Sequence, residues 1–245
     1  MHNGLILGGL AAVVSLVAAA QVPTADLTKP PPDAQHYVIE STGAKHGDSW
    51  LWVTADGTRM GRESLNLRGQ VWELDSSGRA GSDGMPATVA IHGVTPQSDA
   101  NETYTSIDGK ASWKSPVDAG SIAYSSPAFY APQGGPVDLT AWLLERLLAS
   151  PDRTLKLLPG GQAHAEKLTT VEIGSGATKR SVTSWAITGI SNSPIPVWAD
   201  AQDKFFALTV GLGWLPEAYA GELVRLRPRS RPPWPHALRN LLGLW

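Results

Sequence analysis

The histidines are the residues of this chain best suited to metal chemistry, and their spacing argues against it. A catalytic zinc site takes about three protein ligands that converge on one ion. Its usual sequence marks are paired histidines such as H-x-H or H-E-x-x-H. No two of the histidines form such a pair, and the chain contains no cysteine. The sequence therefore predicts no metal site and no cofactor. The six histidines are His2, His36, His46, His92, His164 and His236.

The motifs of nucleophilic and nucleotide chemistry are also incomplete. The Gly-Ser-Gly at 174–176 lacks the G-x-S-x-G pattern that presents a serine nucleophile. The Gly-Leu-Gly at 211–213 lacks the third glycine of a dinucleotide site, and no P-loop occurs. Carboxylate pairs that meet across strands stay open, because a sequence does not show them. Asp56 and Asp108 precede glycines, where aspartate forms turns. No catalytic residue is predicted, and the chain alone is not expected to be an enzyme.

Two tryptophans could form a stacking surface. Trp50 and Trp52 lie two residues apart, so they share one face of the strand expected at 49–54. On an exposed face they would stack on sugars or apolar ligands; on the buried face they would belong to the core. The core is favoured, because aromatic pairs on strands usually pack.

Composition bounds the class of protein. The 245 residues are 42% hydrophobic and 17% charged, which supports a sizeable core. The net charge of -2 provides no basic field, so no nucleic-acid partner is expected. The 25 glycines and 19 prolines indicate the many turns of an antiparallel β protein.

Both ends differ from the middle of the chain. Residues 1–20 end in an uncharged apolar run with small residues at 18 and 20, which predicts a signal peptide and an exported, periplasmic or secreted protein. An uncleaved anchor is the alternative, and it is the only membrane contact expected. Residues 21–35 read as a proline-rich linker, and residues 225–245 as a solvated Arg/Pro-rich tail.

The elements between these ends are mostly strands. Asp-Gly pairs at 56–57 and 108–109 predict two tight hairpins. A last short helix is expected at 216–226, with Pro216 at its first position. The expected strands are 49–54, 59–68, 71–74 (closed by a turn at 75–78), 87–92, 103–107, 110–114, 121–124, 170–173, 181–190, 195–200 and 204–210.

One helix, at 138–150, interrupts the strands. Apolar residues recur at helical spacing on one side, with charged residues on the other. Asp138 is expected to cap its start, and Pro151 to stop it. The predicted fold is mainly β, in the α+β class: a curved antiparallel sheet or partial barrel over 36–224 with one covering helix. The apolar face of the helix comprises Leu139, Trp142, Leu143 and Leu147.

Six short motifs carry a family resemblance. From about Gly47 to Trp214 the chain resembles the N-terminal extension of exported bacterial metal-dependent amidohydrolases of the imidazolonepropionase-like kind. None of the motifs holds a catalytic residue. They are ASWKS at 111–115, LLPGG at 157–161, EKL at 166–168, ITG at 187–189, PIPVW at 194–198 and KFFA at 204–207.

The resemblance implies a (β/α)₈ barrel after this extension, with divalent metal held by an H-x-H pair, an acid or modified lysine, further histidines and an aspartate. Such a barrel needs about 250 residues of its own. Only the Arg/Pro-rich tail follows the match, so no metal ligand or catalytic residue carries over. The chain is therefore expected to be a truncated or frameshifted member that lacks the hydrolase barrel.

Three functions follow as hypotheses. The first is a non-catalytic accessory domain that packs on an amidohydrolase barrel. The second is a periplasmic β-sheet module that grips a lipid or other apolar small molecule between sheet and helix, through Trp142, Leu143 and Leu147 or through the two strand tryptophans. The third is an enzyme with an unrecognised site. A deep apolar pocket under the helix would favour binding, and a well-filled core with an exposed apolar patch would favour docking.

Overall fold

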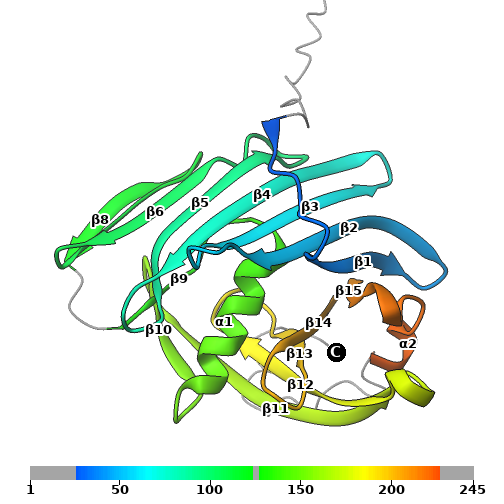
Figure 1. Cartoon of the computed structure of the whole chain (residues 1–245). Helices are drawn as coiled ribbons and strands as arrows, with labels where there is room; N and C mark the ends of the chain where they lie inside the picture. The colour runs from blue at the N-terminus through cyan, green and yellow to red at the C-terminus, as the bar shows by residue number, and fades with distance from the viewer. Residues whose placement is uncertain (1–25, 124–126, 227–245) are drawn as a thin grey trace, which may run out of the picture.

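The computed structural model describes residues 26–123 and 127–226 (Figure 1). The predicted signal peptide and nearly all of the predicted tail lie outside the described residues. The first eight strands are β1 (Gln35–Ser41), β2 (Ala44–Val53), β3 (Arg59–Leu67), β4 (Gln70–Ala80), β5 (Pro86–Val94), β6 (Glu102–Ile107), β7 (Lys110–Lys114) and β8 (Ala119–Ala123). The others are β9 (Phe129–Tyr130), β10 (Thr154–Leu158), β11 (Gln162–Ile173), β12 (Arg180–Thr188), β13 (Ile195–Ala199), β14 (Phe205–Val210) and β15 (Leu212–Pro216).

All of these strands belong to one sheet, in the order β8-β7-β6-β5-β4-β3-β2-β1-β15-β14-β13-β12-β11-β10-β9. Consecutive strands pair antiparallel; only β9 and β10 run parallel. Strand β1 joins the two halves by pairing with β15, where Ile39 lies opposite Trp214. The sheet curves around α1 (Val137–Ala149), which sits in its hollow (Figure 1). The predicted mainly β fold, with a curved sheet and one covering helix, is confirmed.

Both Asp-Gly hairpins are present. Asp108 and Gly109 connect β6 to β7 with φ of 48° and 75°. Positive φ at both central residues matches the twist of the flanking strands, and it is the conformation that Asp-Gly adopts with least strain. The same pair of residue types connects β2 to β3, where Gly57 has a φ of 83°.

Replacing Gly109 by alanine should lower the free energy of unfolding by about 1 kcal/mol, because alanine at positive φ is strained. Urea unfolding of Gly109→Ala measures the change. Gly160→Ala is the matched control, since its added Cβ meets nothing within 4 Å and its φ is not positive. An equal effect of both variants would contradict the role of the turn.

Several predicted boundaries are wrong. Strand β4 continues through the turn expected at 75–78, because Asp75 and Gly78 pair with His92 and Val89 of β5. Strands β1, β9, β10 and β15 were not predicted. The helix expected at 216–226 is two pieces, the 3₁₀ turn η3 (Glu217–Tyr219) and α2 (Leu223–Leu226). A further 3₁₀ turn, η2 (Gly176–Thr178), lies in the hairpin between β11 and β12.

Helix α1 matches its predicted range within one residue at each end, but Asp138 is not its cap. Pro136 holds the N-cap position, and Asp138 lies in the first turn. Its Oδ1 instead accepts a hydrogen bond from Ser76 Oγ of β4 at 2.7 Å. Burial raises the pKa of the Asp138 carboxyl to about 6. Asp138 therefore joins the helix start to the sheet.

The sheet buries apolar residues on both faces. The concave core surrounds α1 and draws on both halves of the sheet, with Leu144 and Leu147 fully buried in the helix. A second core lies on the convex side of the C-terminal half, where Trp198 and Phe206 pack under Tyr219 of η3 and α2. The concave side thus has a filled centre under α1, and the strands extend past the start of the helix.

Candidate functional site

A cavity of about 940 Å³ lies on the concave face beside the start of α1; we call it the trough. Strands β3 and β4 form one wall through alternate residues, which share a face because side chains along a strand alternate. The β14–β15 hairpin forms the opposite wall, and the loop at 95–100 and Val117 close another side. The apolar lining is Leu65, Leu67, Trp72, Leu74, Pro116, Val117, Val210, Leu212 and Trp214.

Glu63 of β3 stands where the trough meets the helix. The residue is 5% exposed, and its Oε2 accepts a hydrogen bond from Trp214 Nε1 of β15 at 2.9 Å. The backbone N–H of Val137, at the first position of α1, also donates to this carboxylate. An N-terminal N–H has no partner within its own helix, so an acceptor there is stabilising. Burial nevertheless dominates and raises the pKa of Glu63 to about 7.

Glu102 of β6 is a second buried carboxylate on the trough, and its acceptors are occupied. Tyr130 Oη donates to Oε1 at 2.5 Å, and the Gln133 backbone N–H lies 3.1 and 3.0 Å from the two oxygens. Burial raises the pKa of Glu102. This residue ties the segment before α1 to the sheet and so fixes the rim of the trough.

The outer rim carries the remaining charged groups. Arg68 is exposed in the turn between β3 and β4, with a φ of 55°. His46 Nε2 lies 2.7 Å from Ser41 Oγ, and Asp99 accepts the backbone N–H of Asn101 at 2.8 Å. The trough therefore has a buried acid beside the start of α1, apolar walls, and a rim with mixed polar groups.

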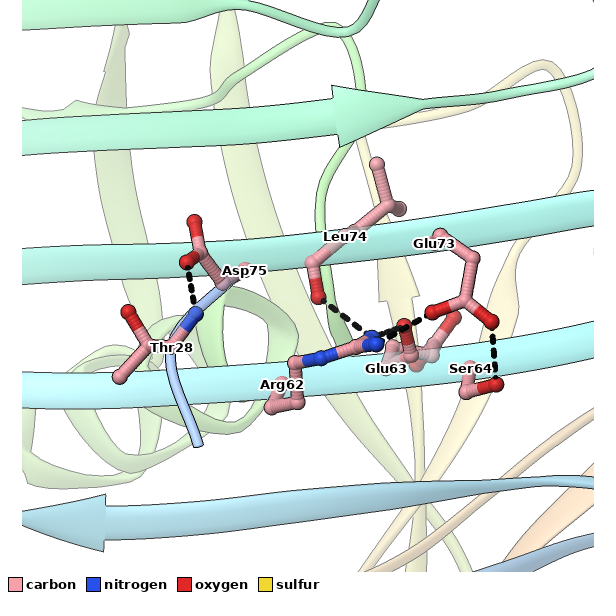
Figure 2. Close-up of polar contacts among 7 residues, drawn as sticks. All are labelled: Thr28, Arg62, Glu63, Ser64, Glu73, Leu74 and Asp75. Carbon is pink, nitrogen blue, oxygen red and sulfur yellow. Dashed lines mark hydrogen bonds and ion pairs between the residues drawn. The ribbon is translucent and has the colours of Figure 1, made fainter. Parts of the chain in front are cut away.

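The opposite, convex side of β3 and β4 holds a separate polar network (Figure 2). Arg62 pairs with Glu73, which also accepts Ser64 Oγ at 2.6 Å. Asp75 accepts the backbone N–H of Thr28 at 2.8 Å, and its other oxygen lies 3.0 Å from His92 Nδ1. These side chains join neighbouring strands, and Asp75 holds Thr28, a residue of the predicted 21–35 linker, against the sheet. Leu27 beside them is buried.

The helix residues predicted to contact an apolar ligand lie elsewhere. Trp142, Leu143 and Leu147 are 2%, 3% and 0% exposed within the concave core, and none of them lines the trough. They are core residues, because the sheet closes over this part of α1. Trp142 also borders a separate cavity of about 480 Å³, lined with Arg59 and several other charged residues.

The strand tryptophans are neither core nor an open platform. Trp50 and Trp52 are half-buried, and the register of β2 places them on the convex face, opposite the trough. Trp50 stacks on His36 with ring centroids 5.2 Å apart. His36 in turn contacts Asp48 at 2.6 Å and Glu217 at 3.1 Å, so the ring of Trp50 is already covered by a side chain of the protein.

Only part of the trough could be predicted from the sequence. The strand predicted at 59–68 contains Leu65 and Leu67 of the wall, but Trp214 lies on β15, which was not predicted. Glu63 is an isolated acid in sequence and gains its role only where β3, β15 and α1 meet. The parts of the chain described here hold no group of three or more His, Cys, Asp or Glu that could bind a metal ion. No helix within them is long and apolar enough to span a membrane.

No protein-family model, curated protein or solved structure matches this chain. The amidohydrolase resemblance stays a prediction, and the function rests on the geometry of the trough.

Proposed function

We propose that this chain is a binding module that holds an apolar small molecule in the trough, between the concave face of the sheet and the start of α1. The observation that carries this proposal is the trough itself, about 940 Å³ in volume and walled by leucine, valine and tryptophan side chains. Ligand sites are typically concave, mostly apolar and about 300–1,000 Å³ in volume, with a few polar groups that orient the ligand.

The packing around the trough supports a preformed site. The neighbouring core under α1 is filled, and Glu102 fixes the segment that forms the rim. Leu65 and Leu74 are buried at the base of the wall, whereas Leu67 and Trp72 are only half-buried towards the mouth. An apolar ligand that covers these side chains would gain about 25 cal/mol for each Å² removed from water.

The test is a fluorescence titration with the neutral apolar probe N-phenyl-1-naphthylamine. Wild-type protein should enhance the emission of the probe, and Leu67→Asp should weaken binding by about tenfold, because a charge in the wall must lose its hydration. Asn66→Asp, exposed on the other face of the same strand, is the matched control. Binding that is absent in wild type, or equal in both variants, would refute the proposal.

The accessory-domain hypothesis is a second candidate, favoured by one observation. Ile122 on the edge strand β8 is 42% exposed, and Ile107 at the end of β6 and Val117 in the β7–β8 turn are 61% and 77% exposed. Apolar residues at an unpaired strand edge are typical of contact surfaces. Translating the downstream DNA in all frames tests this candidate, which expects a (β/α)₈ barrel with an H-x-H pair; its absence there would remove the candidate.

A further inference from the structure

We propose that the ligand of the trough is an amphiphile whose protonated amine binds the Glu63 carboxylate while its apolar part lies along the leucine walls. This inference rests on the proposed function and adds the chemistry of the polar group. Three features of the site support it: the charge of the trough, the acceptor capacity of Glu63, and the apolar path that leads to Glu63.

The charge of the lining favours a cation. Three carboxylate residues border the trough, Glu63, Asp99 and Glu102, against one guanidinium, that of Arg68. Glu63 and Glu102 are buried, whereas Arg68 is exposed at the mouth. Burying an anionic head beside these acids would be unfavourable, because like charges repel strongly where water is excluded.

Of the two buried acids, Glu63 has the capacity to bind a further donor. An ionised carboxylate has about four acceptor positions. Both oxygens of Glu102 already accept from the segment before α1. Glu63 accepts from Trp214 Nε1 and from the Val137 N–H, and the Ser49 hydroxyl is a third partner. About one of the four positions is therefore left for a further donor, and the residue borders the trough. An ammonium group supplies three donors, and its hydrogen bond to a carboxylate is charge-assisted.

The path from the mouth to Glu63 is apolar. From the mouth inward, Leu67 and then Leu65 line the concave side of β3 before Glu63 is reached. Trp72 and Leu74 lie beside them on β4. A ligand that places a cation at Glu63 therefore covers this wall with its hydrocarbon part. A primary amine with a hydrocarbon chain suits both the Glu63 carboxylate and the apolar walls, whereas the matching alcohol suits only the walls.

Binding of an amine at Glu63 should also depend on pH. Burial raises the pKa of Glu63 to about 7, so bound cation and bound proton compete near neutral pH. The groups facing Glu63 are Asp138 of α1, which raises its pKa further, and Trp214 of β15. His46, Arg68 and Glu102 border the same trough.

The experiment displaces N-phenyl-1-naphthylamine with 1-aminododecane, 1-dodecanol and dodecanoate, each below its critical micelle concentration, at pH 5.5 and pH 8.5. A primary amine stays protonated at both values. We expect the amine to bind wild type at pH 8.5 at least about tenfold more tightly than the alcohol, which is the usual effect of one charge-assisted hydrogen bond. At pH 5.5, where Glu63 is protonated, this preference should largely disappear.

Glu63→Gln keeps the shape of the side chain and removes its charge. It should reduce amine binding at pH 8.5 to the level of the alcohol and leave alcohol binding unchanged. Glu73→Gln, on the convex face of the paired strand, should behave as wild type. Tighter binding of dodecanoate, or an amine preference that survives in Glu63→Gln, would overturn the inference while leaving the binding module intact. Failure of every ligand and of the probe would instead remove the proposed function.

Discussion

Trp142→Ala should lower the free energy of unfolding by about 3–5 kcal/mol, the usual cost of removing a large aromatic side chain from a core. Trp142 is 2% exposed in the middle of α1, with the Phe129 ring edge-on at 5.8 Å. The Arg59 guanidinium lies over its other side, 5.3 Å from the ring centroid. Urea unfolding followed by far-UV circular dichroism measures the loss.

The sheet accommodates this tryptophan because glycine stands beneath it. A Cβ added at Gly78 of β4 would lie 2.8 Å from Trp142 Cζ3, closer than atoms pack. Gly78→Val should therefore cost about 1–3 kcal/mol through overpacking. The cost should fall in the Trp142→Ala background, where the ring is gone, and this double-mutant cycle isolates the contact.

Ser77→Val is the matched control for the cycle, since residue 77 is adjacent to Gly78 and points to the other face of β4. Its effect should be the same with and without Trp142. Equal costs of Gly78→Val in both backgrounds would show that the glycine serves the strand itself and not the seating of the helix.

Glu63→Gln should flatten the pH dependence of stability and raise the free energy of unfolding at alkaline pH. Burial raises the pKa of Glu63 from 4.5 to about 7 in the folded protein. The unfolded chain then releases its proton at lower pH than the folded protein does, so stability is lost as pH rises from about 4.5 through 7. At roughly 1.4 kcal/mol for each pKa unit, the loss above pH 8 is about 3 kcal/mol.

Urea midpoints at pH 5 and pH 8.5 measure this effect. Glu63→Gln should resemble wild type at pH 5 and exceed it at pH 8.5. The pKa of Asp138 is also raised, so in the variant the free energy of unfolding still falls with rising pH, but more weakly, between about pH 3.8 and 6. Glu73→Gln should retain the full wild-type slope. A slope that is unchanged in Glu63→Gln would show that this carboxyl does not titrate near neutral pH in the folded protein.

The urea-unfolding assay and the displacement assay report different properties of Glu63. The stability profile reports the burial of Glu63 without a ligand, whereas the displacement assay reports its charge towards a bound amine. A flattened stability profile together with an unchanged ligand preference would place Glu63 in the fold alone, as the acceptor for the first N–H of α1.

The sequence by itself determined the local elements of this protein. The Asp-Gly pairs specify their hairpins because few other residues adopt positive φ at low cost. The spacing of Leu139, Trp142 and Leu147 specifies α1 because only a helix brings such positions to one face. The alternation of Val89 and Ile91 similarly predicts strand β5, whose ends its pairing partners then extend.

Tertiary structure alone decided the site. Strands β1 and β15 lie far apart in sequence, and their pairing brings Trp214 to within hydrogen-bonding distance of Glu63, 151 positions away. It also decided that Trp142, Leu143 and Leu147 are core and that Trp50 and Trp52 face the convex side, since the register of each strand sets which face its side chains occupy. The trough forms because the sheet extends beyond the start of α1, and that excess length is a property of the assembled sheet that no local pattern encodes.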